Sequence, residues 1–291
     1  MSRASGFLCR RRIVELGVLL ALAVAVMALT AGTAFAAVTY VGVGSATGVW
    51  AEGAVSPGPV SISMPAPSGS VGDVLICQVN FRGGTDGTIP ATFTGWTLLD
   101  RTDSTTADGQ VVYYRIATAT TEGPYTWTYT NSSGSRSRAA GNIIRYSGVD
   151  TSTPPAVTGN SGTTSLASAN GLTTSAANTK ILAFFGNYNT TAIGTSTGMT
   201  SRYAFTGATN GPSIRSFDET IAVSGTSTLP RTATCGTGGW VAHMVALKPK
   251  STNVTVTATG VNRIYDGTTA ASVVVTSSSF GPGDNATATY T

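Results

Sequence analysis

Charged residues, histidine and cysteine are all scarce in this chain. Only 10% of its 291 residues are charged, against about a quarter in an average soluble domain. A Ser-His-Asp or Cys-His catalytic site would have to use His243, the single histidine, which lies in an apolar run and is predicted to be a packed core residue. A zinc site needs about three or four His, Cys or acidic ligands, so the same scarcity argues against one.

The acidic residues do not suggest a catalytic pair. Glycoside hydrolysis needs two carboxyl groups on opposite sides of the scissile bond. Asp218 and Glu219 are adjacent, and adjacent residues of a strand point to opposite faces, so they cannot face each other. We therefore expect no catalytic activity and no obligatory cofactor, with a polysaccharide-degrading enzyme as a minor alternative.

The N-terminal sequence has the three parts of a secretory signal peptide. Arg10, Arg11 and Arg12 precede an apolar run over 18–29, and Ala34-Phe35-Ala36 supplies the small residues for cleavage after position 36. The run is shorter than the roughly 20 residues that span a membrane. We therefore expect a signal peptide over 1–36, a mature protein that is extracellular or on the cell surface, and no membrane contact after cleavage.

Removal of the leader changes the charge balance. The leader carries four arginines and one glutamate, so the net charge falls from +4 to +1 without it. Nucleic-acid binding depends on clustered positive charge that neutralises phosphates, so the mature chain offers little support for it. We expect no nucleic-acid partner.

Two cysteines, Cys77 and Cys235, follow the leader. In an oxidising compartment such a pair can form a disulfide, which here would close a loop of about 158 residues and constrain the unfolded chain. The alternative is two unrelated buried thiols. The sequence alone leaves both possibilities open.

Threonine and glycine replace the missing charge. Threonine is roughly one residue in five after the leader, and its β-branched side chain favours strands, whereas glycine favours the turns between them. Short alternating apolar segments recur at spacings near ten, a pattern typical of sandwiches and jelly rolls. The predicted strands are 38–43, 60–64, 73–81, 96–101, 110–117, 125–130, 140–147, 180–188, 199–205, 214–223 and 239–248. The chain is therefore predicted to be all-β, with a jelly-roll-like or concanavalin-like β-sandwich over 37–249.

One predicted strand carries an aromatic stripe. Tyr125, Trp127 and Tyr129 alternate with threonines, as expected of a half-buried strand. Flat aromatic rings suit both a protein core and the face of a sugar ring, so the stripe is either core packing or a carbohydrate-stacking platform. Trp50, in a glycine-rich stretch, is a further candidate for ligand binding.

A cluster of aspartates suggests a second kind of site. Asp100, Asp103 and Asp108 lie close in sequence and, if their loop brought them together, would offer the oxygen ligands that calcium prefers. Their spacing does not match an EF-hand, and a solvated hairpin with Asp108-Gly109 at its turn explains them as well.

The main domain resembles a known class of modules. The segments GWTLLDR (95–101), YYRIA (113–117), YTWTY (125–129), YSGVD (146–150) and WVAHMVALKP (240–249) are similar to those of β-sandwich modules in secreted bacterial multidomain proteins. The resemblance covers most of 38–249. It implies architecture and location rather than chemistry.

A different pattern begins after a short linker at 249–252. Residues 254–259 alternate, Tyr265-Asp-Gly-Thr-Thr-Ala270 follows, and a strand is predicted at 272–276. This segment resembles the start of a YDG-type (MBG-like) repeat of bacterial surface adhesins, although Asp266-Gly267 is also a good tight turn by itself. The resemblance implies a partial repeat over 250–291, and we expect more tandem repeats in a longer protein.

These observations together predict a secreted or cell-surface, non-catalytic module for adhesion or carbohydrate binding. The expected partner is an extracellular glycan or a surface protein, with calcium as the one candidate ion. The alternative is a structural spacer of a larger extracellular protein, with no ligand of its own. Exposure of the aromatic residues distinguishes the two, because a spacer should bury them.

Overall fold

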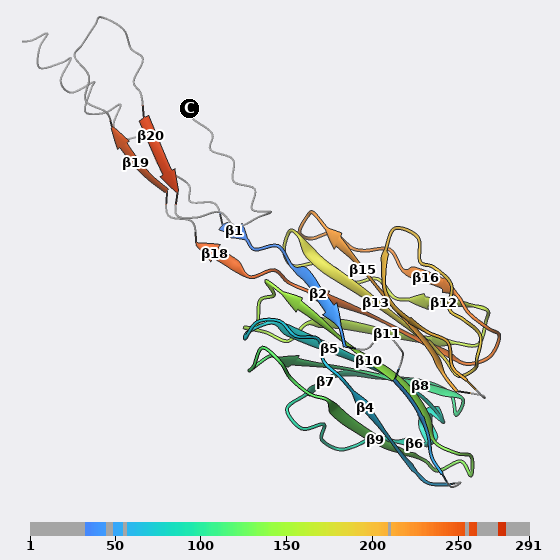
Figure 1. Ribbon diagram of the computed structural model, residues 1–291. Coiled ribbons are helices and arrows are strands. Elements are labelled where there is room, and N and C mark those ends of the chain that lie inside the picture. Colours follow the sequence, from blue (N-terminus) through green and yellow to red (C-terminus); the bar gives the residue numbers. More distant parts are fainter. Residues whose placement is uncertain are drawn as a thin grey trace, which may run out of the picture. The chain divides into compact units, whose positions relative to one another are not determined.

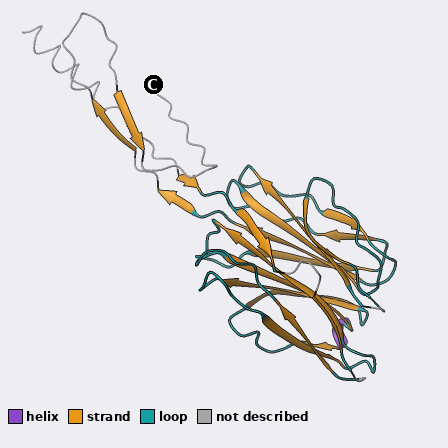
Figure 2. Cartoon of the chain, in the orientation of Figure 1, coloured by secondary structure: helices purple, strands orange, loops and turns teal. Residues whose placement is uncertain are grey.

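The computed structural model describes residues 33–44, 49–54, 57–208, 211–253, 256–260 and 273–277. The regular structure in these ranges is β-strand apart from one short 3-10 turn, η1 (Gly84–Asp86) (Figure 2). The all-β prediction is therefore confirmed. No helix in the described ranges is long and apolar enough to cross a bilayer. The chain divides into a large compact unit that spans Phe35–Thr252 and a small one that includes Asn253–Gly281.

The first half of the large unit forms two sheets. Inner sheet 1 has the strand order β2-β10-β5-β8-β7, with β3 also paired to β10, and outer sheet 1 has the order β4-β9-β6. The bounds of these strands are β2 (Thr39–Val43), β3 (Val49–Glu52), β4 (Pro59–Met64), β5 (Val74–Arg82), β6 (Gly87–Thr88), β7 (Thr97–Ser104), β8 (Asp108–Ile116), β9 (Tyr125–Asn131) and β10 (Arg138–Ser147).

The second half repeats this arrangement. Inner sheet 2 has the order β11-β17-β13-β15-β14, and outer sheet 2 pairs β12 with β16. The bounds are β11 (Ala156–Gly162), β12 (Leu166–Ala169), β13 (Thr179–Asn187), β14 (Thr200–Phe205), β15 (Ser213–Ile221), β16 (Arg231–Thr234) and β17 (Trp240–Leu247). The strands correspond in chain order, so the large unit contains one sandwich topology twice. The prediction of a single sandwich over 37–249 did not include this duplication.

The sheets stack with the two inner sheets in the middle (Figure 1). On β5, Cys77 and Val79 pack toward outer sheet 1, whereas Ile76 on the other face packs against the second sandwich. On β17, Met244 packs toward outer sheet 2, and Val245 packs toward the first sandwich. Both strands are covered on both faces, so β17 is buried throughout, and the polar side chains of β5, Gln78 and Asn80, are buried as well.

The interface between the two sandwiches is part apolar and part polar. Apolar side chains of β5, β8, β10, β13 and β17 fill one region. Elsewhere the first sandwich bonds directly to backbone of the second, with Gln78 Nε2 donating to the carbonyl of Phe185 at 3.0 Å and Asn80 Nδ2 donating to that of Asn187 at 3.2 Å. Both amide side chains are fully buried, so these bonds offset their desolvation.

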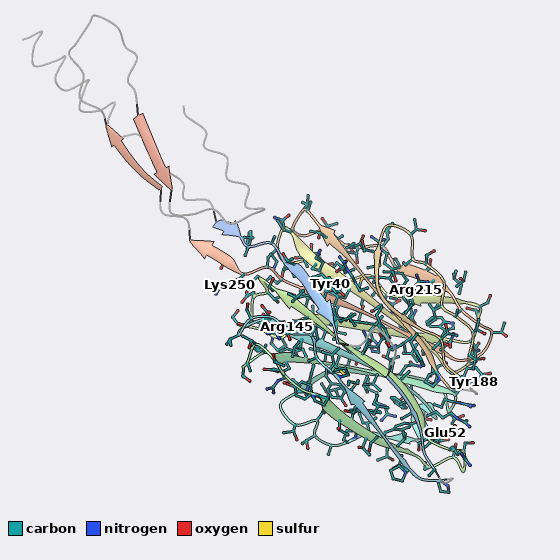
Figure 3. The ribbon with its side chains drawn as sticks, in the orientation of Figure 1. Tyr40, Glu52, Arg145, Tyr188, Arg215 and Lys250 are labelled. Atoms are coloured by element: carbon teal, nitrogen blue, oxygen red, sulfur yellow. The ribbon has the colours of Figure 1, made fainter. Side chains whose placement is uncertain are left out.

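Buried Arg145 of β10 joins two loops of the first sandwich (Figure 3). Its Nε donates to Asp73 Oδ2 at 2.8 Å. Its remaining donors bond to the carbonyl oxygens of Pro67, Ser70, Ala119 and Thr120. The second of these loops leads directly into the segment that precedes β9.

Each strand predicted within 37–249 overlaps an observed strand, and β17 is buried along its whole length as expected. The sequence did not predict β3, β6, β11, β12 or β16. Asp108-Gly109 is not the predicted hairpin turn, because both residues pair with β5 as the start of β8.

The small unit contains an antiparallel pair, β19 (Val256–Gly260) and β20 (Val273–Ser277). Within the described residues, these strands overlap the alternation at 254–259 and the strand predicted at 272–276. The YDG-like residues 265–270 lie outside the described residues. Two short strands, β1 (Thr33–Phe35) and β18 (Ser251–Asn253), occur where the division between the units falls in the sequence.

Candidate functional site

A groove of about 280 Å³ lies against β9 of outer sheet 1. Its walls come from the β9 strand, the residue before it and the segment between β6 and β7. The lining residues are Pro90, Thr92, Phe93, Thr94, Pro124, Tyr125, Thr126 and Thr128. None of them is charged, so the groove offers rings, prolines and hydroxyl groups.

Glu122 fixes the position of the groove's tyrosine. The Tyr125 hydroxyl donates to Glu122 Oε2, and Arg115 Nε donates to the same oxygen at 2.8 Å. The other carboxylate oxygen accepts the backbone N–H groups of Thr118 and Ala119. The Arg115 guanidinium also lies over the Tyr125 ring, 5.4 Å from its centroid. The ring is therefore held in place before any ligand arrives.

The pKa values of this cluster follow from its contacts. Burial alone raises the pKa of Glu122, but hydrogen bonds from Arg115, Tyr125 and the backbone outweigh it and lower the pKa from 4.5 to about 2. Burial, followed by the hydrogen bond to Glu122, raises the pKa of Tyr125 to about 12. Tyr125 is thus a neutral donor and Glu122 an ionised acceptor at physiological pH, and neither is poised for acid–base catalysis.

An aromatic cluster supports the groove from behind. Phe93 stacks on Trp96 with ring centroids 5.3 Å apart, and Trp96 meets Tyr125 edge-on at 5.2 Å. Trp96 is 8% exposed, and its indole N–H has no hydrogen-bond acceptor in the part of the chain that the structure describes. The buried indole N–H of Trp240 likewise has no partner among the described residues, so this feature is not specific to the groove.

The structure divides the predicted aromatic stripe. Trp127 and Tyr129 are buried in the core of the first sandwich, where Trp127 Nε1 donates to the Tyr113 hydroxyl at 3.2 Å. Tyr125 is half-buried and lines the groove. Trp127 and Tyr129 are therefore corrected to core residues, because the alternation of β9 turns them toward β5. Tyr125 shares this inward face and packs against the same core, but it stays half-buried because it is the first residue of the strand. Trp50 belongs to β3, and its side chain lies outside what the structure describes.

The predicted calcium cluster is not formed. Asp103 pairs with Arg101 Nε at 3.0 Å, whereas Asp100 on the other face of β7 lies 3.2 Å from His243 Nε2. Asp108 is fully buried, accepts from Asn80 Nδ2 at 2.8 Å, and has a pKa raised well above its ordinary value by burial. Among the described residues no group of three or more His, Cys, Asp or Glu side chains gathers as a metal site.

The candidate disulfide is also corrected, because Cys77 and Cys235 are both free and buried. Cys77 lies between inner sheet 1 and outer sheet 1, and Cys235 lies between the two sheets of the second sandwich. Both inner sheets separate them, and packed sheets are about 10 Å apart, well beyond the reach of a disulfide.

His243 is a core residue, as the sequence predicted. It is fully buried on β17, and its Nδ1 lies 2.7 Å from Gln110 Oε1 of β8. Its hydrogen bond is the leading cause that lowers the pKa of Asp100. The residue therefore links the two sandwiches.

Asp218 and Glu219 diverge as expected. Asp218 accepts from Tyr146 and Arg202 at the junction of the sandwiches, whereas Glu219 pairs with Arg231 on the opposite face. They do not form a facing carboxylate pair.

A second concavity, of about 190 Å³, lies beside the ion pair of Asp150 and Lys248, whose charged atoms are 2.9 Å apart. The hydrogen bond from Lys248 is the main cause that holds the pKa of Asp150 well below its ordinary range. Because these charges satisfy each other, this concavity offers less to a ligand than the groove at Tyr125.

Sequence reasoning found Tyr125 but missed the residues that position it. The sequence signal for Glu122 was that it is one of few acidic residues and lies just before an aromatic strand.

No protein-family model matches the chain, and neither a curated protein nor a solved structure matches it.

Proposed function

We propose that this chain is a secreted or cell-surface, non-catalytic module that binds carbohydrate through the groove at Tyr125. One observation carries the proposal, which is a tyrosine ring held by Glu122 and Arg115 at the edge of an uncharged groove. A ring supplies a flat face for a sugar, and threonine hydroxyls supply hydrogen bonds to its hydroxyl groups. Preorganisation lowers the entropic cost of binding.

Secretion and surface location rest on the leader-like N-terminus, and the surface context rests on the YDG-like segment. The absence of catalysis rests on the separation of the acids and the core position of His243. Binding without turnover is the simplest chemistry that these residues support.

A structural spacer is the second candidate, and a specific observation favours it. Trp127 and Tyr129, two of the three members of the predicted aromatic stripe, are at most 1% exposed. A duplicated sandwich with a hydrogen-bonded interface is also well suited to hold other domains apart.

A glycan array probed with the purified protein, with and without calcium, separates the two functions. Carbohydrate binding predicts a saturable signal that calcium does not change. Analysis of the bound sugars for cleavage products checks the absence of catalysis. A blank array with protein that is folded by circular dichroism would favour the spacer, and sugar cleavage would contradict both.

A further inference from the structure

The outward face of outer sheet 1 is formed by hydroxyl side chains. On β4 and β9 the inward residues are apolar or aromatic, and the exposed positions between them are Ser61, Ser63, Thr126 and Thr128. Thr88 on β6 is also exposed and pairs with Thr130. None of these residues can carry a charge, so the face can recognise a neutral ligand without an electrostatic penalty.

The register places these hydroxyls in cross-strand rows. Ser61 is opposite Thr128 and Ser63 is opposite Thr126. The Ser61 and Thr128 hydroxyl oxygens are 2.6 Å apart. Rows along a strand repeat about every 6.8 Å, and neighbouring strands are about 4.8 Å apart, so the hydroxyls form a regular array on one surface.

The array is continuous with the groove. Thr126 and Thr128 belong to both, and the groove adds Tyr125 on one side and Pro90 and Phe93 on another. The groove and the hydroxyl array therefore meet along β9, whose Thr128 is paired with Ser61 of β4. A ligand that filled only the groove would leave that array unused.

The charge beside the groove also favours a neutral ligand. Arg115, whose guanidinium lies over the Tyr125 ring, is already paired with Glu122, so it does not provide a site for an anionic sugar.

We propose that the groove and the hydroxyl array together bind chains at the surface of an insoluble, neutral polysaccharide, without calcium. This inference rests on the proposed carbohydrate-binding function and specifies its ligand. The sugar chain lies along the outward face of β9, over Thr126, Thr128 and Ser61, and reaches the groove at the end of the strand where Tyr125 lies. Anionic polysaccharides are excluded because no cation lines the groove.

The test is co-sedimentation of the purified protein with microcrystalline cellulose and with chitin powder, beside titration with soluble neutral oligosaccharides and an anionic polysaccharide. Thr128→Val removes one hydroxyl while keeping the side-chain shape, and we expect it to weaken binding to the solid about fivefold. Thr128→Ser keeps the hydroxyl and should bind nearly as the wild type does. Thr232→Val is the matched control, because Thr232 is an exposed threonine on β16, the counterpart of β9.

Each outcome decides between the two proposals. Sedimentation with a neutral solid that Thr128→Val weakens and Thr232→Val does not supports the inference. Binding to soluble oligosaccharides alone, or binding to the solid that Thr128→Val leaves unchanged, overturns the inference and leaves the proposed function standing. Preference for the anionic polymer or a need for calcium also overturns it. No binding by folded protein to any of these probes or to the glycan array overturns both.

Discussion

Replacement of Arg145 by methionine removes the cation that joins two loops, one before β5 and one before β9. Arg145 is fully buried, and its guanidinium bonds to Asp73 Oδ2 at 2.8 Å as well as to carbonyl oxygens of two loops. Methionine fills part of the volume but donates no hydrogen bond. Asp73 is then left as a buried carboxylate without its counter-charge.

The expected loss of stability is about 3–5 kcal/mol, the usual cost of removing one partner from a buried ion pair. Urea unfolding at neutral pH measures it from the shift of the transition midpoint. Arg136→Met is the matched control, because the Arg136 side chain is 51% exposed and lies 3.4 Å from Glu52. Such an exposed pair contributes no more than about 1 kcal/mol.

The double variant Arg145→Met/Asp73→Asn should recover part of the loss, because it removes the unpaired carboxylate as well. A loss below about 1 kcal/mol for Arg145→Met, equal to that of the control, would refute the claim that this arginine organises the loops.

Further predictions concern the titrating and thiol groups. Burial raises the pKa of Asp108, so the folded chain keeps a proton that the unfolded chain loses, and stability should fall as pH rises above the ordinary aspartate range. Asp108→Asn should flatten that slope in melting curves against pH, and an unchanged slope would contradict the assignment. The pKa of Glu122, lowered to about 2, adds stability above its ordinary pKa of 4.5 that is lost as pH falls through about 2. Glu122→Gln should therefore melt earlier at neutral pH and lose less on acidification, whereas equal melting temperatures would argue against the cluster. Cys77 and Cys235 should react with a thiol reagent only after unfolding, and a non-reducing mass that shows a disulfide would contradict their separation.

Local patterns predicted much of the fold. The alternation of Tyr125, Trp127 and Tyr129 identified β9 and its inward face, and the doubly apolar run 240–247 identified the buried strand β17. Strands β12 and β16 were missed because their inward residues are small, with Ala167 opposite Ala233 where the first sandwich has Ile62 opposite Trp127. Alanine gives little hydrophobic contrast against serine and threonine.

The duplication was hidden for the same reason. One visible signal was the pair Gly95-Trp96-Thr97 and Gly198-Met199-Thr200, each of which leads into a corresponding strand. Both glycines have positive φ, at 78° and 81°, a conformation that other residues rarely adopt. Two such signals are too short to reveal a repeat without the strand pairing.

The site was only partly predictable because its parts are distant in sequence. Tyr125 belonged to a visible stripe, but Phe93 and Trp96 reach it only through the packing of the segment before β7. Proximity in sequence was misleading for Asp100 and Asp103, which strand alternation places on opposite faces of β7. The fold therefore separates Asp100 from Asp103, which are close in sequence, and brings Phe93 and Trp96 to Tyr125, which is distant in sequence.

The most direct test of carbohydrate binding is calorimetric titration of the best neutral glycan into wild type, Tyr125→Ala and Tyr188→Ala. Tyr188 is a close control, because it is also half-buried and also has an arginine, Arg82, 5.4 Å from its ring centroid. The account predicts that Tyr125→Ala weakens affinity by about tenfold or more, as expected for a central aromatic contact, and that Tyr188→Ala leaves it unchanged. Equal affinity for all three folded proteins would contradict the placement of the site at Tyr125.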